Sequence, residues 1–150
     1  MRMKKILLAE DNPFDLELAL AGLAEYRLTN EVVIARDGAE TLDYLKRRGQ
    51  FADRPVGSPM VILLDLKMPK VDGLEVLRQI KSDPALRTIP IVVLTSSREE
   101  QDVVESYNLG VNAYVVKPVQ FREFVKAVKE IGLFWAILNE SPPGSVKQIK

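Results

Sequence analysis

The sequence predicts an α/β protein: a doubly wound, parallel sheet of five strands with helices on both faces. Five short apolar segments alternate along the chain with five segments of helical periodicity. The segment MVILLD (60–65) is apolar without alternation and IVVLTSS (91–97) begins in the same way, which favours strands covered on both faces. The length of 150 residues and the hydrophobic fraction of 47% suit one domain with a substantial core.

Each strand and helix has its own signal in the sequence. The strands are expected at the apolar segments 4–9, 31–35, 60–65, 91–97 and 113–118. The helices are expected at 13–26, 38–48, 74–83, 98–110 and 121–139, where apolar residues recur at helical spacing. The segment 49–59 is rich in Gly and Pro and is expected to be a long surface loop.

Capping residues predict where several helices begin and end. Asn12 followed by Pro13 marks the start of the first helix, because Asn is a favoured N-cap and proline suits the first turn. Pro84 stops the third helix, since proline cannot continue the backbone hydrogen bonds. Gly110 is the expected C-cap of the fourth helix.

The composition excludes several kinds of chemistry. Lys and Arg together number 21, as do Asp and Glu, so the chain has no general attraction to nucleic acid or to an anionic membrane surface. It has no cysteine and no histidine, which excludes disulfides, thiolate nucleophiles and imidazole as base or ligand. No apolar run approaches the roughly 20 residues that cross a membrane, and the start is a poor signal peptide, so a cytoplasmic location is expected.

Polar residues gather where the predicted strands end. In open parallel sheets, sites form outside the carboxyl ends of the strands. The residues expected there are Glu10 and Asp11 after the first strand, Asp65 after the third, Thr95 and Ser96 after the fourth, and Lys117 and Pro118 after the fifth. Each of them alone is explained as a turn former, a helix cap or a solvated charge. Their gathering at one edge favours a functional site instead.

The residue types at this edge indicate phosphoryl transfer with a hard metal ion. Three clustered carboxylates suit Mg²⁺, which binds oxygen ligands and keeps several waters. With Mg²⁺ and the Lys117 ammonium beside it, Asp65 can attack a phosphoryl group, because both cations neutralise charge on the transferred oxygens. The Thr95 hydroxyl can donate a hydrogen bond to a phosphoryl oxygen. The adjacent acids Glu10 and Asp11 are then tolerated, since positive charge lies beside them.

These motifs resemble the receiver domain of two-component response regulators. The residues that carry the resemblance are Glu10-Asp11, the segment LLDLKMPKVDG around Asp65, Thr95-Ser96 and Lys117-Pro118. The resemblance covers nearly the whole chain. It implies a flavodoxin-like receiver fold with strand order 2-1-3-4-5, and a phospho-acceptor switch that catalyses only its own phosphorylation and dephosphorylation.

The resemblance implies roles for the acids and lysines of the site. Asp65 is similar to the phosphoryl acceptor. Glu10, Asp11 and Asp65 resemble the Mg²⁺ acids, with Glu10 acting through water, and the backbone carbonyl of Lys67 resembles the remaining protein ligand. Lys117 resembles the lysine that pairs with the phosphoryl group. The Lys67 side chain is expected over the phosphoryl group, where it would control the lifetime of the phosphorylated form.

The resemblance also implies a switch beside the acceptor. Thr95 resembles the hydroxyl residue that shifts toward the phosphoryl group, and Tyr114 resembles the aromatic residue that turns inward with it. Pro118 resembles the family's cis-proline. The loop after the acceptor is represented by Met68, Pro69 and Gly73.

Two segments carry a narrower resemblance to stand-alone regulators that partner bacterial phytochrome histidine kinases. These segments are RRGQFADRPVGSP before the third strand and LFWAILNESPP near the end. A histidine kinase, of the bacteriophytochrome type in this narrower comparison, is then the expected partner. The expected domain organisation is a receiver domain at 1–140 and a flexible tail at 141–150, with no room for a DNA-binding domain. Output is expected through protein contacts or by passing the phosphoryl group onward.

The last predicted helix has more apolar surface than one packing face needs. The residues Phe124, Val128, Ile131, Trp135 and Leu138 fall on one side at helical spacing. Leu133, Phe134 and Ile137 point elsewhere, so they are expected to be exposed. An exposed apolar patch favours association, and a homodimer through this helix is expected. Docking to a kinase and packing against the tail are the alternatives.

Three other functions share parts of this pattern. A haloacid-dehalogenase-like phosphatase needs a second Asp two residues after the first, where this chain has Lys67. A flavodoxin-like electron carrier needs a phosphate-binding loop after the first strand, but this loop is acidic and repels phosphate. A receiver-like binding module that is never phosphorylated is disfavoured by the complete acceptor set.

Overall fold

The sheet has the predicted five parallel strands. The computed structural model describes residues 5–142. Its strands are β1 (Ile6–Ala9), β2 (Val32–Ala35), β3 (Val61–Leu64), β4 (Ile91–Thr95) and β5 (Ala113–Val116). They lie in the order β2-β1-β3-β4-β5 with every neighbouring pair parallel, which confirms the predicted fold class and strand order. Several strands end earlier than predicted, because residues such as Asp65 and Ser96 leave the sheet and enter loops.

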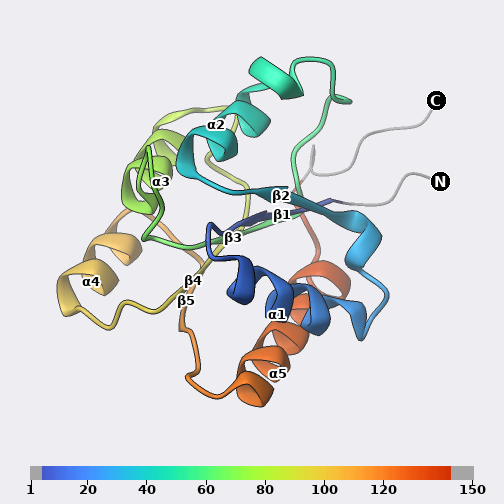
Figure 1. Cartoon of the computed structure of the whole chain (residues 1–150). Helices are drawn as coiled ribbons and strands as arrows, with labels where there is room; N and C mark the ends of the chain where they lie inside the picture. The colour runs from blue at the N-terminus through green and yellow to red at the C-terminus, as the bar shows by residue number, and fades with distance from the viewer. Residues whose placement is uncertain (1–4, 143–150) are drawn as a thin grey trace.

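Helices cover both faces of the sheet. They are α1 (Pro13–Ala24), α2 (Gly38–Lys46), α3 (Gly73–Ser82), α4 (Glu100–Asn108) and α5 (Phe121–Ile131). Figure 1 shows α1 and α5 on one side of the sheet and α2, α3 and α4 on the other. Within the described residues, no helix combines the length and the apolar character needed to cross a membrane. From residue 143 onward, the predicted tail lies outside the described residues, as does Lys4 of the first predicted strand.

The core consists of two apolar layers, one on each face of the sheet. On β1, Leu7 and Ala9 pack with α2 and α3, whereas Ile6 and Leu8 pack with α1 and α5. Strands in the middle of the sheet therefore need apolar residues at every position. The four residues of β3 are all buried, as the lack of alternation in the sequence predicts.

A predicted side-chain cap fixes the start of α1. The side-chain oxygen of Asn12 accepts hydrogen bonds from the backbone N–H groups of Phe14 (2.9 Å) and Asp15 (3.0 Å). Pro13 occupies the first turn, where its missing N–H costs nothing. The cap places Asp15 on the first turn of α1, next to the end of β1.

The predicted surface loop at 49–59 is more ordered than its composition suggests. It begins with a short 3₁₀ helix, η2 (Gly49–Phe51), and Arg54 anchors the rest. The Arg54 guanidinium lies 4.1 Å from the centre of the Tyr44 ring and donates to the Tyr44 carbonyl at 2.7 Å. It also donates to the carbonyls of Pro55 and Gly57 (2.8 and 2.9 Å). One half-buried arginine head group thus satisfies several backbone carbonyls of this irregular segment and of the end of α2.

The last helix changes its hydrogen-bond pattern at Gly132. A π-helical segment, η3 (Gly132–Leu138), follows α5 without a break. Its bonds run from residue i to residue i+5, as between the Asn139 N–H and the Phe134 carbonyl (2.7 Å). Gly132 packs tightly against α1, because a Cβ at this position would lie 2.9 Å from a methyl group of Leu23.

The structure differs from the predicted apolar stripe in the π-helical segment. Phe124, Val128 and Ile131 are buried as predicted, and Trp135 is partly buried against the same layer. The prediction for Leu138 was wrong, because its side chain is 64% exposed. The wider turn of a π-helix rotates the following residues about the axis, so spacing at 3.6 residues per turn no longer holds there.

Replacing Gly22 of α1 by alanine should destabilise the protein, although alanine is ordinarily the better helix former. A Cβ at Gly22 would lie 2.7 Å from the Val125 carbonyl oxygen and 2.9 Å from the Val128 Cβ, both on α5. The expected loss in free energy of unfolding is about 1–3 kcal/mol, measured by urea denaturation. The control is Ala21→Gly at the exposed neighbour, which should lose about 1 kcal/mol from helix propensity alone. A more stable Gly22→Ala protein would contradict the close packing of α1 on α5.

Candidate functional site

Three carboxylates meet at the carboxyl edge of the sheet, as the sequence predicts. Glu10 and Asp11 follow β1, and Asp65 follows β3, which is the neighbour of β1. One carboxylate oxygen from each lies within 4.8 Å of the others. Backbone bonds hold both loops to the sheet, since the Glu10 N–H donates to Ala35 and the Asp65 N–H donates to Ala9. Glu10 and Asp65 are buried, whereas Asp11 is exposed.

The Lys117 ammonium joins three carboxylates at this edge. It lies 2.7 Å from a Glu10 oxygen, 2.8 Å from an Asp15 oxygen and 3.0 Å from an Asp65 oxygen. Burial lowers the pKa of Lys117, but the hydrogen bonds with Asp15 and Glu10 and the charge of Asp65 outweigh this, so its pKa is raised above the ordinary value. Lys117 is therefore positively charged wherever the protein is folded near neutral pH.

Lys117 alone does not neutralise the acids. The pKa of Glu10 is raised from 4.5 to about 7, because burial and, to a lesser extent, the charge of Asp65 outweigh the lowering effects of Lys117 and of the Asn12 N–H. The site thus has an excess of negative charge. Three carboxylates within reach of one hard cation are the ligand set that Mg²⁺ and similar divalent ions prefer, so the residues fit such an ion.

The loop after Asp65 turns tightly around the Asp65 carboxylate. The Lys67 N–H donates to the Asp65 carboxylate at 3.2 Å, which brings the Lys67 backbone against the acid cluster. Gly73 allows α3 to begin directly beside this loop, because a Cβ there would lie 2.4 Å from the Asp65 carbonyl oxygen. Met68 is buried in the core and Pro69 is exposed.

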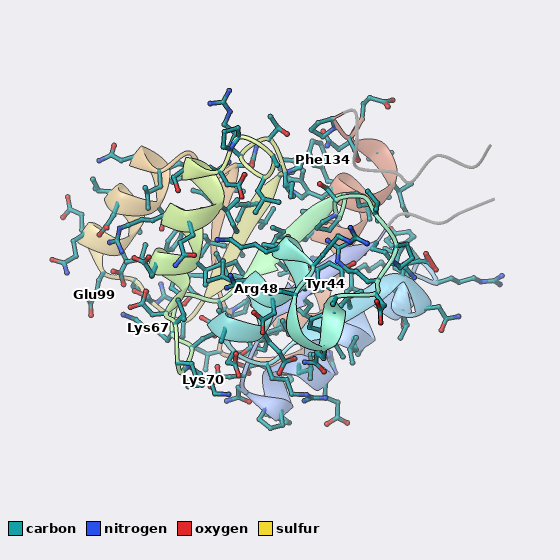
Figure 2. All side chains as sticks on the ribbon, turned by 90° about the horizontal axis from the view of Figure 1, so that it is seen from above. Tyr44, Arg48, Lys67, Lys70, Glu99 and Phe134 are labelled. Atoms are coloured by element: carbon teal, nitrogen blue, oxygen red, sulfur yellow. The ribbon has the colours of Figure 1, made fainter. Side chains whose placement is uncertain are left out.

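The Lys67 side chain does not lie over the acid cluster in this structure. Its ammonium is 3.4 Å from a carboxylate oxygen of Asp102, on the first turn of α4. Figure 2 shows Lys67 and Glu99, the residue before α4, on the same outer edge of the molecule. The expectation that Lys67 controls the lifetime of a phosphorylated form stays a prediction.

The loop after β4 brings the predicted switch residues together. Thr95 is fully buried, its hydroxyl accepts from the Ser97 N–H (3.4 Å), and its carbonyl accepts from the Lys117 N–H (2.7 Å). The Tyr114 hydroxyl donates to the Ser97 carbonyl at 3.1 Å, with the ring half-buried. Ser96 is exposed and lines a cavity of about 250 Å³ together with Lys117, Pro118 and the start of α1.

The peptide bond before Pro118 differs from the cis bond that the family resemblance implies. It is trans, whereas the resemblance implied a cis bond. A bond before proline favours trans by about 0.5–1 kcal/mol when nothing opposes it. With this trans bond, the Lys117 ammonium lies 2.7 Å from Glu10 and 3.0 Å from Asp65.

Sequence reasoning missed two acids of the site, Asp15 and Asp102. Both lie in the first turn of a helix, where acidic residues are common because they complement the helix dipole. Their spacing therefore gives no hint of a contact with a lysine far along the chain. The one available signal for Asp15 was its place on the loop-to-helix junction directly after the acid pair.

The arrangement can receive a phosphoryl group. A buried carboxylate, Asp65, lies 3.0 Å from the Lys117 ammonium and belongs to a cluster of three acids that can share a cation. The Thr95 hydroxyl and the loop after β4 lie at the same edge. The sequence has no histidine or cysteine nucleophile, and a carboxylate is a group that forms covalent phosphate intermediates.

Comparison with known proteins identifies the family. The family model for the response regulator receiver domain matches residues 6–129. The response regulator Rcp1 of Synechocystis sp. is 42% identical over 132 residues, which cover 88% of this chain and 88% of Rcp1. A solved structure of Rcp1 in its Mn²⁺-bound form superposes with a TM-score of 0.86 at 41% identity, covering 93% of this chain and 99% of that one.

Two other solved structures are also similar along nearly the whole chain. The phosphorylated cyanobacterial phytochrome response regulator RcpA is 44% identical with a TM-score of 0.88, covering 94% of this chain and 99% of that one. The bacteriophytochrome response regulator RtBRR is 62% identical with a TM-score of 0.75, covering 96% of this chain and 87% of that one. The chain therefore belongs to the response regulator receiver domain family, the phospho-acceptors of two-component signalling.

Proposed function

We propose that Asp65 is the phosphoryl acceptor of this receiver and that a histidine kinase is the donor. The observation that supports this most directly is the buried Asp65 carboxylate, held 3.0 Å from the Lys117 ammonium within a cluster of further acids. Because the chain has no histidine, the phosphohistidine must belong to another protein. The role of this protein is that of a switch which catalyses only its own phosphorylation and dephosphorylation.

In the transfer step, a carboxylate oxygen of Asp65 attacks the phosphorus of the donor phosphohistidine. The new O–P bond forms as the P–N bond breaks, and the electron pair of that bond stays on the imidazole nitrogen. Lys117 stabilises the charge on the transferred oxygens, and it remains in place because Asp15 and Glu10 also bind it. In hydrolysis, water attacks the same phosphorus and returns Asp65 to a carboxylate with release of inorganic phosphate.

The metal ion of the site is Mg²⁺ in this proposal. Its ligands are the carboxylates of Asp11 and Asp65 and the backbone carbonyl of Lys67, with Glu10 binding through water. When bound, Mg²⁺ supplies positive charge to the transferred oxygens. The fit is supported by the cluster of three carboxylates, whose oxygens lie within 4.8 Å of one another.

Thr95 and Tyr114 form the switch in this proposal. A phosphoryl group adds charge and acceptor oxygens, which attract the Thr95 hydroxyl. Thr95 contacts Ser97 and the Ser97 carbonyl accepts from Tyr114, so a shift of Thr95 reaches the Tyr114 ring through one short loop. The surface formed by α4, β5 and α5 then changes and is read by a partner protein.

The proposed donor is a kinase of the phytochrome type. The relatives RcpA and RtBRR are described as phytochrome and bacteriophytochrome response regulators. Both are similar to this chain over more than nine tenths of its length. We place the protein in the cytoplasm, and the balance of 21 basic and 21 acidic residues gives no support for binding nucleic acid.

We also propose a homodimer through the end of the last helix. Phe134 is 50% exposed, Ile137 48% and Leu138 64%, so the π-helical segment presents an apolar patch. Leu133, predicted to be exposed, is partly buried instead. Figure 2 shows Phe134 far from Lys67, so pairing at this patch leaves the acceptor site open. Exposed apolar patches of this kind commonly pair in a symmetric dimer.

The Asp65→Asn protein should take up no phosphoryl group from acetyl phosphate in the presence of Mg²⁺. An amide is not a nucleophile toward phosphorus, so loss should be complete. Intact-protein mass spectrometry measures the uptake, and Asp53→Asn, at an exposed acid outside the site, is the matched control. Stoichiometric, base-labile phosphate on the Asp65→Asn protein would show that another residue is the acceptor.

Mg²⁺ should raise the melting temperature of the unphosphorylated protein. The ion relieves repulsion among three carboxylates, so it binds the folded state and stabilises it by mass action. The expected rise is about 3 °C at tenfold excess over the Kd, measured by calorimetry. Asp11→Ala should abolish this rise and Asp53→Asn should not. No rise at saturating millimolar Mg²⁺ would contradict the metal site.

Phe134→Glu should convert a dimer to a monomer, because a charge cannot be buried unpaired in an apolar interface. Sedimentation velocity of the unphosphorylated and beryllofluoride-treated proteins measures the mass. Val56→Glu replaces an exposed apolar residue on the 49–59 loop and should leave the dimer intact. The Phe134→Glu protein should still accept phosphate on Asp65. A wild-type protein that is monomeric under both conditions would refute the proposed dimer.

A further inference from the structure

A buried carboxylate on the first turn of α4 contacts two loops near Asp65. Asp102 lies on the first turn of α4, and its side chain is 6% exposed. One of its oxygens accepts a hydrogen bond from the Ser97 hydroxyl at 2.6 Å and lies 3.4 Å from the Lys67 ammonium. Ser97 belongs to the loop after β4, and Lys67 to the loop after β3.

The two partners of Asp102 differ in how firmly they are held. Ser97 is buried, and its carbonyl accepts from the Tyr114 hydroxyl. The Lys67 side chain is 60% exposed, and among residues 5–142 this ion pair with Asp102 is its one charged contact. A buried carboxylate loses much of its hydration, so the Lys67 ammonium supplies a counter-charge that Ser97 cannot supply.

Lys67 is also tied to the acceptor. It stands two residues after Asp65, and its backbone N–H donates to the Asp65 carboxylate at 3.2 Å. Phosphorylation of Asp65 adds a group with a charge of about −2 directly beside this backbone. A flexible lysine side chain near two anionic groups is shared between them according to their relative attraction.

We propose that Asp102 is a positioning residue for Lys67, and that the phosphoryl group on Asp65 competes with Asp102 for the Lys67 ammonium. The proposal rests on Asp65 being the acceptor. In the unphosphorylated protein, Asp102 holds the ammonium at the first turn of α4. Phosphorylation draws it away and leaves Asp102 bound to Ser97 without a counter-ion. The start of α4 and the Ser97 carbonyl that holds Tyr114 then lose a constraint, independently of Thr95.

Because Asp102 competes for the Lys67 ammonium, it should disfavour phosphorylation of Asp65. Asp102→Asn keeps an oxygen for the Ser97 hydroxyl but removes the charge that holds Lys67. The Lys67 ammonium is then free for the phosphoryl group. The affinity for beryllofluoride, a phosphoryl mimic, should increase about two- to fivefold, as expected for one partly exposed ion pair. Titration of the Mg²⁺-loaded protein with beryllofluoride, followed by NMR, measures this affinity.

Two backgrounds at Lys67 and one control substitution separate a role through Lys67 from a merely structural one. In a Lys67→Gln background, Asp102→Asn should change the beryllofluoride affinity by less than about 1.5-fold, because the competing ammonium is gone. In a Lys67→Arg background, which keeps the charge, Asp102→Asn should again raise the affinity. Glu100→Gln removes an equal charge from the same turn of α4, at an exposed position, and should leave the affinity unchanged.

An equal effect of Asp102→Asn with Lys67 and with Gln at position 67 would overturn the proposal, because Asp102 would then act through packing of α4. No increase, or a decrease, in the presence of Lys67 would overturn it as well. If the Asp102→Asn protein does not fold, an NMR measurement on the wild-type protein tests the proposal instead. The side-chain ε-methylene signals of Lys67 should shift on addition of beryllofluoride, whereas those of Lys81, bound to the Arg87 carbonyl, should not. Unshifted Lys67 signals would refute the competition.

Failure of this inference is distinguishable from failure of the proposed function. If wild type binds no beryllofluoride and takes up no phosphate, the acceptor assignment fails first. If wild type binds the mimic, Asp65→Asn does not, and Asp102→Asn has no effect that depends on Lys67, the acceptor stands and the role of Asp102 is refuted.

Discussion

The contact of one ammonium with three carboxylates is the constraint on which the rest of the site depends. Lys117 follows β5 at one edge of the sheet, whereas Glu10 and Asp65 follow the central strands β1 and β3. The Lys117 side chain must therefore extend past the end of β4, and the Lys117 N–H is fixed to the Thr95 carbonyl there. The sheet order thus decides which charges meet, and the excess of acid at that edge requires a second cation.

The two lysines of the site differ in burial and in the number of acids they contact, and this difference bears on the roles proposed for them. Lys117 is buried among Glu10, Asp15 and Asp65 and contacts all three carboxylates. Lys67 is mostly exposed and has a single acid as partner. A fixed charge suits stabilisation of a transfer step, since no reorganisation is needed. In the switch proposed above, the exposed Lys67 ammonium moves between Asp102 and the phosphoryl group, and such a two-state element suits the transmission of a signal.

The sequence predicted the fold and the strand-end residues well, for a physical reason. Strands buried on both faces have unbroken apolar stretches, and the polar residue that ends each stretch is conspicuous, as with Asp65 and Lys117. Asp15 was not predicted, because an acid in the first turn of a helix is ordinary. The π-helical turn at Gly132 was not predicted either, since apolar spacing alone does not distinguish bonds to the fourth residue from bonds to the fifth.

The π-helical segment also contains an intrinsic fluorescent probe. The chain has one tryptophan, Trp135, and it lies in this segment. Its ring is partly buried and meets the Phe134 ring edge to face, with 5.0 Å between the centroids. Indole emission responds to the polarity around the ring, so the intrinsic fluorescence of this protein reports the end of the last helix. Any spectral change caused by chemistry at Asp65 would therefore record a signal that has crossed the molecule.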